Sequence, residues 1–234
     1  MTKHARFGPS SMKRIMNCPA SVKLQEQAPP DRGSAYAAEG TRAHEVGEAL
    51  LLQDGSAAAA YRACEAAGDD LTEVTRCVEI YANYCNPLLD KADNYGIEAT
   101  VRYSDDLFGT VDCWVRIGRT LYVIDYKHGV GVTVAAENNE QGLTYAALIC
   151  EDESIKVGYD DIDKVVIVII QPRGQGKPID EWECEVDVVY EHFTKCLDAC
   201  KAADEDAPVN EMGDWCKFCR AKLICPAIHK AEQC

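Results

Sequence analysis

Apolar residues recur at two different periods along this chain. In residues 34–52 and 71–93 they recur every three or four positions, which places them on one side of a helix. From Ile97 the period changes to two, as in a strand with one buried face. The alternating segments are "IEATVRY", "GTVDCWVRI" and "TLYVIDYK", which we expect to form three consecutive strands between residues 97 and 127.

The rest of the chain adds further elements to this sheet. Residues 137–151 and 190–204 are expected to be helical. The segment "DKVVIVIIQP" (163–172) has the uninterrupted apolar run of a strand that is buried on both faces, and "WECEVDVV" (182–189) is a further expected strand. Helices around one mixed central sheet make an α/β or α+β fold.

The second and third expected strands form a hairpin with a defined register. Gly118 at the first position of a two-residue turn fits a type II′ turn. Counting back from this turn brings Asp112 opposite Asp125. Opposed side chains of an antiparallel pair lie about 5 Å apart, so two carboxylates there repel each other unless a cation lies between them.

A lysine accompanies the two aspartates. Lys127 lies two residues beyond Asp125 and therefore shares its face of the strand. Two carboxylates with a neighbouring ammonium form a site for a hard divalent cation such as Mg²⁺ or Mn²⁺. The alternative is that Asp112 and Asp125 lie on a solvated edge and never meet. His44 is a further candidate ligand, although a lone helical histidine is more often a surface or core residue.

Composition and charge limit where the protein can act and what it can bind. No apolar run approaches the roughly 20 residues of a membrane span, and no signal-peptide core follows the N-terminus, so we expect a cytoplasmic protein without membrane attachment. The net charge of −15, taken alone, argues against a sequence-independent grip on nucleic acid. Two groups of basic residues form either a local basic track or scattered solvated charges; they are Lys3, Arg6, Lys13 and Arg14, and Lys217, Arg220 and Lys222.

The chain has thirteen cysteines, an odd number without a secretory signal, which argues against a disulfide framework. Six of them lie in helix-like stretches and are expected to act as small apolar residues; they are Cys64, Cys77, Cys85, Cys150, Cys196 and Cys200. Cys216, Cys219 and Cys225 differ, because their C-x2-C-x5-C spacing can place three thiolates around one metal centre. Such a centre usually takes four protein ligands. Cys234 is a poor fourth ligand because terminal residues are rarely tied down.

Gln141 and Tyr145 lie four residues apart on one side of an expected helix, although an ordinary amphipathic helix has the same spacing. With the residues above they form a series of motifs: G-x3-H ending at His44, "GTVD" with Asp112, "DYK" with Asp125 and Lys127, and Q-x3-Y with Gln141 and Tyr145. The order of these motifs resembles that of the RecB-like branch of the PD-(D/E)XK nuclease superfamily.

The resemblance implies a restriction-endonuclease-like fold and metal-dependent hydrolysis of phosphodiester bonds. The implied enzyme is a single-stranded DNA exonuclease acting in recombination, repair or phage replication. Its metal ligands would be His44, Asp112, Asp125 and the backbone carbonyl of Tyr126, with Lys127 orienting the attacking water, Gln141 and Tyr145 positioning the strand, and Glu98 outside the ligand shell.

The cysteines extend the resemblance. Iron–sulphur members of this branch, such as AddB-type and CRISPR-associated exonucleases, place one cysteine before the nuclease core and three after it, commonly with this spacing. The fourth ligand of a [4Fe–4S] cluster would then be Cys18, which would join an N-terminal segment (1–33) to a cysteine-rich C-terminal segment (206–234). The nuclease core would be 34–205, with a helical insertion at about 53–95. Zinc is the alternative metal.

Two functions of other classes would use parts of the same sequence. A non-catalytic DNA-binding or assembly module has no use for opposed carboxylates, and an iron–sulphur electron carrier needs neither the aspartates nor Lys127. The chain has no G-x4-G-K-[ST] motif and therefore no helicase motor of its own. The expected partners are DNA that is single-stranded or has free ends, and a helicase, recombinase or single-strand-binding protein.

Overall fold

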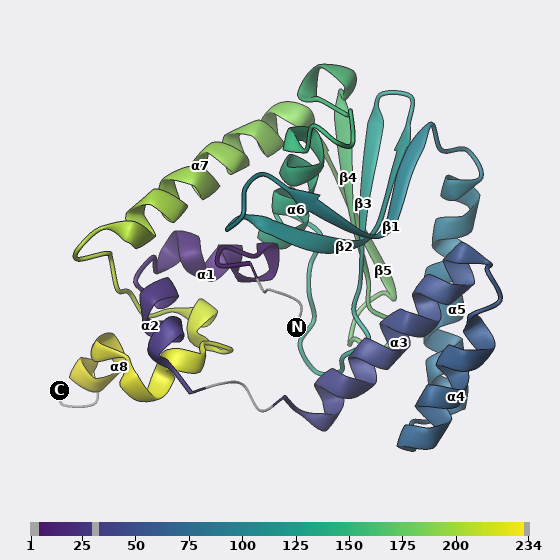
Figure 1. The fold of residues 1–234 in the computed structure, drawn as a ribbon, viewed down its shortest axis with the longest axis horizontal. Coiled ribbons are helices and arrows are strands. Elements are labelled where there is room, and N and C mark those ends of the chain that lie inside the picture. The colour runs from purple at the N-terminus through teal and green to yellow at the C-terminus, as the bar shows by residue number, and fades with distance from the viewer. Residues whose placement is uncertain (1–4, 30–32, 232–234) are drawn as a thin grey trace.

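A five-stranded mixed sheet forms the centre of the computed structural model, which describes residues 5–29 and 33–231 (Figure 1). Lys3 and Cys234, considered above, lie outside these ranges. The strand order is β1-β2-β3-β4-β5, and neighbours are antiparallel except for the parallel pair β3 and β4. The strands are β1 (Asn94–Arg102), β2 (Phe108–Ile117), β3 (Thr120–Tyr126), β4 (Lys164–Ile170) and β5 (Ile179–Glu185).

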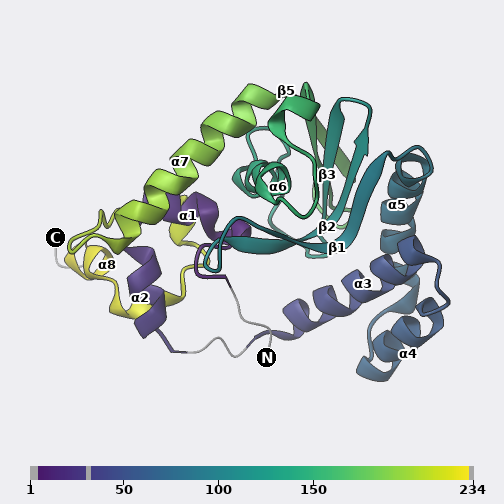
Figure 2. The ribbon, with the colours of Figure 1, turned by 45° about the horizontal axis from the view of Figure 1, so that its top comes forward.

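Helices lie on both sides of this sheet, so the predicted mixed α/β (α+β) class is confirmed (Figure 2). One side is covered by α6 (Glu140–Glu151) and α7 (Val186–Asp204), and the other by α3 (Ala35–Leu52) and α5 (Leu71–Leu89). No helix in the described ranges combines the length and apolar character that crossing a membrane requires. The remaining helices are α1 (Met12–Asn17), α2 (Ser21–Gln27), α4 (Ala57–Ala67) and α8 (Pro226–Ala231).

The sheet separates two hydrophobic cores, because successive side chains of a strand point to opposite faces. Leu121 and Val123 of β3 belong to the core beneath α6 and α7, whereas Ile124 and Tyr126 belong to the core beneath α3 and α5. In β4 every residue after Lys164 is buried, as its uninterrupted apolar run predicts.

The β2–β3 hairpin has the predicted register from its turn as far as Cys113, which pairs with Ile124. Gly118 has a φ of +58°, as the first turn position of a type II′ turn requires. The ladder pairs end there, before Asp112 and Asp125. Asp112 instead accepts a hydrogen bond at 2.7 Å from the backbone N–H of Tyr126, so its carboxylate reaches across to β3.

The expected strand at 182–189 is wrong in its second half. β5 ends at Glu185, and α7 begins at Val186. Val189, Phe193 and Cys196 are buried at helical spacing in α7, and this period prevails over the short alternation before it. Between residues 53 and 95 the chain forms two helices, α4 and α5, and α4 begins at the alanine run at 57–60, since alanine has the highest helix propensity.

The two terminal segments lie side by side, which brings α1, α2 and α8 together at one end of the molecule (Figure 1). The backbone N–H of Ala20 donates to the carbonyl of Val209 at 3.1 Å. Lys13 forms an ion pair with Asp214 at 3.0 Å. Residues that are almost 200 positions apart in the sequence are therefore neighbours in space.

Candidate metal centre

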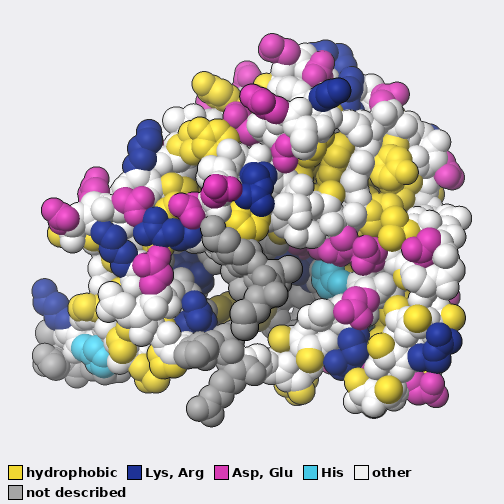
Figure 3. All heavy atoms as spheres, viewed as in Figure 1, with side chains coloured by type: hydrophobic (Ala, Val, Ile, Leu, Met, Phe, Trp, Pro, Cys, Tyr) yellow, Lys and Arg dark blue, Asp and Glu magenta, His cyan; other side chains and the backbone are white. Residues whose placement is uncertain are grey.

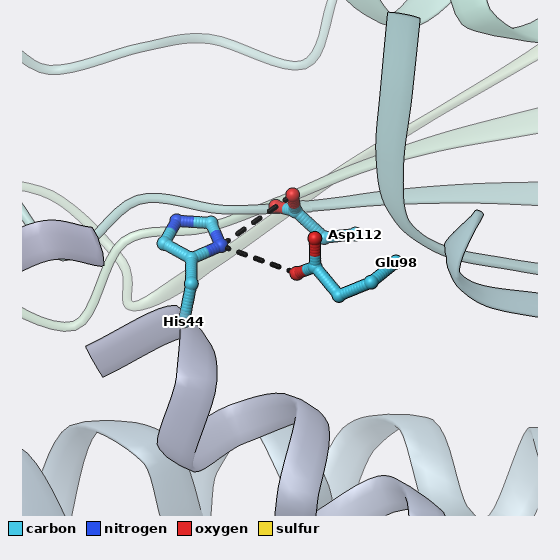
Figure 4. A group of neighbouring side chains, drawn as sticks. All are labelled: His44, Glu98 and Asp112. Carbon is cyan, nitrogen blue, oxygen red and sulfur yellow. Dashed lines mark ion pairs between the residues drawn. The ribbon is translucent and has the colours of Figure 1, made fainter. Parts of the chain in front are cut away.

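Three side chains from three elements meet at one edge of the sheet (Figure 4). Nδ1 of His44 in α3 lies 3.6 Å from Oε1 of Glu98 in β1 and 3.5 Å from Oδ1 of Asp112 in β2. All three ligand atoms lie within 4.8 Å of one another, and no other His, Cys, Asp or Glu trio in the described ranges meets this distance. One imidazole and two carboxylates suit Mn²⁺ or Mg²⁺.

A bend in the sheet places Glu98 in this group. Glu98 has a φ of +44°, in the left-handed region that costs a side-chain-bearing residue of order 1–3 kcal/mol. Before the bend Ile97 packs into the core of α3 and α5, and after it Ala99 packs into the opposite core. The side chains of β1 therefore exchange faces of the sheet at Glu98. The Glu98 carboxylate lies as near to His44 as the Asp112 carboxylate does.

The imidazole of His44 is held from two sides. Its ring meets the ring of Tyr126 edge-on at 5.2 Å, and Tyr126 stacks on Tyr81 of α5 at 5.1 Å. Burial alone would lower the pKa of His44, but the carboxylates of Asp112 and Glu98 raise it to about 10. In the metal-free protein His44 is therefore a cation between two anions, in the place that a metal ion would take.

The affinity of the metal-free protein for Mn²⁺ is expected to rise with pH towards about 10. A metal ion at Nδ1 must displace the proton of His44, so each pH unit below the pKa of about 10 weakens binding roughly tenfold. The stability of the metal-free protein has the opposite pH dependence. Protonated His44 stabilises the fold fully below its unfolded pKa of 6.5, and this contribution is lost as pH rises towards 10.

Calorimetric Mn²⁺ titrations between about pH 6.5 and 8.5 measure this dependence. His44→Ala should flatten it. An affinity that does not change with pH in the unsubstituted protein would contradict the placement of the metal on His44.

Beside the trio, Lys127, Asp125 and Gln141 form a closed set of hydrogen bonds. Oδ1 of Asp125 accepts from Nζ of Lys127 at 3.0 Å and from Nε2 of Gln141 at 2.9 Å. Nζ of Lys127 also donates to Oε1 of Gln141 at 3.1 Å. Gln141 therefore holds the carboxylate and the ammonium in fixed positions.

Asp125 retains an unused acceptor atom. Its Oδ2 lies 2.8 Å from Nζ of Lys127 but has no hydrogen-bond partner with acceptable geometry, although it is buried. Burial and the nearby carboxylate of Asp112 raise the pKa of Asp125, against the opposing effect of Lys127. Such an oxygen is suited to a cation, yet Asp125 does not belong to the trio of ligand atoms within 4.8 Å.

The other expected site residues lie at the border of this centre. Tyr126 contributes its ring to the packing of His44 and its N–H to Asp112. Tyr145 is buried, and burial followed by the charges of Asp125 and Asp112 raises the pKa of its hydroxyl. Tyr145 also lines a large neighbouring cavity.

A separate small cavity is lined by Cys18, Cys216, Cys219 and Cys225. The thiols of Cys18 and Cys225 both donate to Oδ1 of Asn210, at 3.6 and 3.7 Å. Every cysteine in the described part of the chain is a free thiol. The structure therefore brings the N-terminal cysteine to the C-terminal trio.

Polar groups around this cavity suit a charged occupant. Oγ of Ser21 is buried there without a hydrogen-bond partner. The Arg14 guanidinium also lines the cavity, near the sulfurs of Cys18, Cys216 and Cys219. An unpartnered hydroxyl and a cation fit a thiolate-bound metal centre, whose net charge is negative.

The glycine of the "GTVD" segment is required by close packing. A Cβ on Gly109 would lie 2.7 Å from Cδ of Pro9 and 3.0 Å from Cε1 of Tyr145. Gly109→Ala is therefore expected to destabilise the protein by about 1–3 kcal/mol through overpacking. Gly40 of α3 has no atom within 4 Å of such a Cβ, so Gly40→Ala should stabilise the helix by up to about 1 kcal/mol.

Urea denaturation of the two variants measures both effects. Equal stability of Gly109→Ala and the unsubstituted protein would show that Pro9 does not pack on β2 as described.

Comparisons with known proteins identify a family and solved structures of similar fold. A solved structure titled "Crystal structure of SSO0001" has 15% sequence identity and a TM-score of 0.38, with 93% of this chain and 85% of that chain covered. This likeness is too low to support an inference about function. A family model described as "Protein of unknown function (DUF2800)" matches residues 4–233. Because this match extends over nearly the whole sequence, the chain belongs to the DUF2800 family.

Proposed function

We propose that this protein is a divalent-metal-dependent deoxyribonuclease that degrades single-stranded DNA from free ends. The observation that carries the proposal is the trio of His44, Glu98 and Asp112 directly beside the hydrogen-bonded Lys127 and Asp125. A site that only stabilised the fold would not need a partly buried lysine next to its cation. The order of motifs along the chain, which resembles that of RecB-like nucleases, supports the same chemistry.

Each residue has a defined task in phosphodiester hydrolysis. When bound, Mg²⁺ or Mn²⁺ would lower the pKa of a water molecule and offset the charge of the scissile phosphate. His44, Glu98 and Asp112 would hold the ion, and three protein ligands leave room for water and substrate.

Lys127 would supply a second positive charge beside the metal ion. Burial alone would lower its pKa, but Asp125 raises it, so the side chain stays protonated. Fixed by Asp125 and Gln141, the ammonium would orient the attacking water and stabilise charge that develops on the phosphate oxygens.

We also propose a [4Fe–4S] cluster held by Cys18, Cys216, Cys219 and Cys225. All four cysteines line one cavity of the structure. Their order and spacing resemble those of the iron–sulphur members of the RecB-like branch, and this resemblance favours a cluster over zinc. Its role is structural, because hydrolysis transfers no electron.

Digestion of linear and covalently closed circular single-stranded DNA tests the preference for ends. With Mn²⁺ present, the linear strand should be degraded and the circle should persist, because the chain has neither a sequence-reading motif nor a motor. Cutting of both at equal rates would exclude an exonuclease, and cutting of neither would exclude the nuclease.

A further inference from the structure

A cavity of about 890 Å³ lies between the N-terminal segment, the β1–β2 hairpin and the C-terminal cysteine segment. This volume is within the range of ligand-binding clefts. Figure 3 shows a hollow between the side of the molecule with α1 and α2 and the side with α3, with Lys and Arg side chains gathered near α1 and α2. Its lining includes Arg6, Arg14, Arg220, Phe108, Phe218 and Tyr145.

The arginines give the cavity a positive charge on an otherwise acidic protein. Glu26 is the one acidic side chain among the described lining residues, and it pairs with Arg6 at 2.9 Å. Arg14 donates to Oγ of Ser11 at 2.8 Å, and Arg220 donates to the carbonyl of Gln25 at 3.4 Å. Within the described ranges neither Arg14 nor Arg220 forms an ion pair with a carboxylate; Arg14 also faces the cysteine cavity, whereas Arg220 is exposed and open to an anion.

These two arginines come from the two basic groups noted in the sequence. Arg14 lies in α1 and Arg220 follows Cys219, and the packing of the termini brings them to one cavity. Each guanidinium presents several N–H donors in a plane, which suits bidentate contacts with phosphate. The net charge of −15 is therefore compatible with a local phosphate-binding surface.

Aromatic rings accompany these charges. Phe218 is 70% exposed beside Arg220, although a phenylalanine gains free energy by burial. The guanidinium of Arg102 lies over the ring of Phe108, 4.4 Å from its centroid. Phe108 lines the cavity together with Arg220. One exposed ring, that of Phe218, among arginines matches the stacking platforms that bind unpaired bases.

The cavity is lined by residues of the two strands that carry Glu98 and Asp112. Thr100 and Thr110 line it and are paired across β1 and β2. They lie two residues beyond Glu98 and Asp112, which is about 7 Å along a strand. Tyr145, also in the lining, is close enough to the metal-centre carboxylates for their charges to act on its hydroxyl.

We propose that this cavity binds the segment of single-stranded DNA next to the scissile phosphate, with Arg14 and Arg220 on its phosphates and Phe218 stacked on a base. The placement of the scissile phosphate at the metal centre rests on the proposed nuclease function. A duplex keeps its bases paired and stacked, so it cannot offer one to Phe218. An acidic peptide would satisfy the arginines but not the exposed ring.

Fluorescence anisotropy with a labelled oligodeoxythymidine of about twelve nucleotides tests the site in Asp112→Asn, which should bind without cleaving. In this background Phe218→Ala should weaken binding about tenfold or more, since stacking on one base is lost. Arg220→Gln should reduce the slope of log affinity against log salt by about 0.7, the value for one phosphate contact on a single strand.

Matched controls come from the same C-terminal segment. Leu223 is 81% exposed and Lys230 is exposed, and neither lines the cavity. Leu223→Ala and Lys230→Gln should bind like the Asp112→Asn parent. Iron and zinc analysis of each variant ensures that a change in binding does not arise from loss of the metal at Cys219.

The outcomes separate this inference from the proposed function. Unchanged affinity in Phe218→Ala and an unchanged salt slope in Arg220→Gln overturn the strand site, even if the unsubstituted protein cleaves DNA. Displacement of the oligonucleotide by polyglutamate of equal charge, at equal concentration, also overturns it. Binding that depends on Phe218 and Arg220 supports the site, even if the unsubstituted protein cleaves nothing and the nuclease proposal fails.

Discussion

Asp112→Asn is expected to weaken Mn²⁺ binding by more than about a hundredfold and to abolish DNA cleavage. Loss of a residue that only orients a ligand costs roughly 10–100-fold in metal affinity, so loss of a ligand itself should cost more. Asparagine is the appropriate substitution because its side-chain oxygen can still accept from the N–H of Tyr126. Alanine would leave that donor unsatisfied, at a cost of about 1–3 kcal/mol.

This hydrogen bond changes the stability expected for Asp112→Ala, compared with an argument from charge alone. Two opposed carboxylates suggest that removing one relieves repulsion and stabilises the sheet. In the structure Asp112 also pairs with His44 and caps a backbone donor of β3, so we expect alanine to destabilise the protein.

Asp105→Asn is the matched control, because Asp105 lies in the β1–β2 loop and its side chain is 93% exposed. Isothermal titration with Mn²⁺ and a cleavage assay should give the unsubstituted values for this variant. Full Mn²⁺ affinity in Asp112→Asn would contradict the assignment of the metal centre.

Cys18→Ala is expected to give a colourless protein without iron and with a much lower stability. A metal centre that joins Cys18 to Cys216 closes a loop of about 200 residues, and a cross-link of this length contributes at most about 5 kcal/mol by chain entropy. The termini of the domain would separate, and the cavity between them would lose its shape. Activity should therefore fall through loss of the fold rather than loss of the chemistry.

Iron analysis and thermal unfolding of anaerobically purified protein measure both effects. Cys200→Ala is the control, because Cys200 is a partly buried cysteine of α7 away from the cysteine cavity. A full metal complement in Cys18→Ala would show that Cys18 is not a ligand. Zinc in place of iron would retain the link between the termini and refute the cluster.

The hairpin was accessible to sequence reasoning because two local signals agree. The period of two and the glycine at position 118 both fix the pairing between β2 and β3, which the structure confirms from Ile117 to Cys113. Neither signal predicts the structure beyond the last ladder pair, Cys113 with Ile124. The orientation of Asp112 depends on a hydrogen bond to the backbone of β3, which no pattern of residues encodes.

The position of Glu98 illustrates a different limit. Glycine or asparagine at a bend would have indicated a positive φ, but glutamate gives no such signal. Only the three-dimensional fold supplies the contacts that hold this backbone and bring the carboxylate to His44.

The sequence separates the two groups of basic residues, and only the fold shows which of them lie together. The packing of α1 and α2 against the C-terminal segment brings Arg6, Arg14 and Arg220 to one cavity. The end of β5 was missed for a local reason, since Cys184, Val186 and Val188 continue an alternation that the helical period of α7 overrides.

The release of nucleotides from end-labelled linear single-stranded DNA tests the central proposal most directly. The measurement compares the unsubstituted protein with Mn²⁺, the same protein with a chelator, and Asp112→Asn with Mn²⁺. The proposed function predicts progressive loss of label in the first reaction and none in the other two. Intact DNA in the first reaction, or equal degradation in all three, would contradict it.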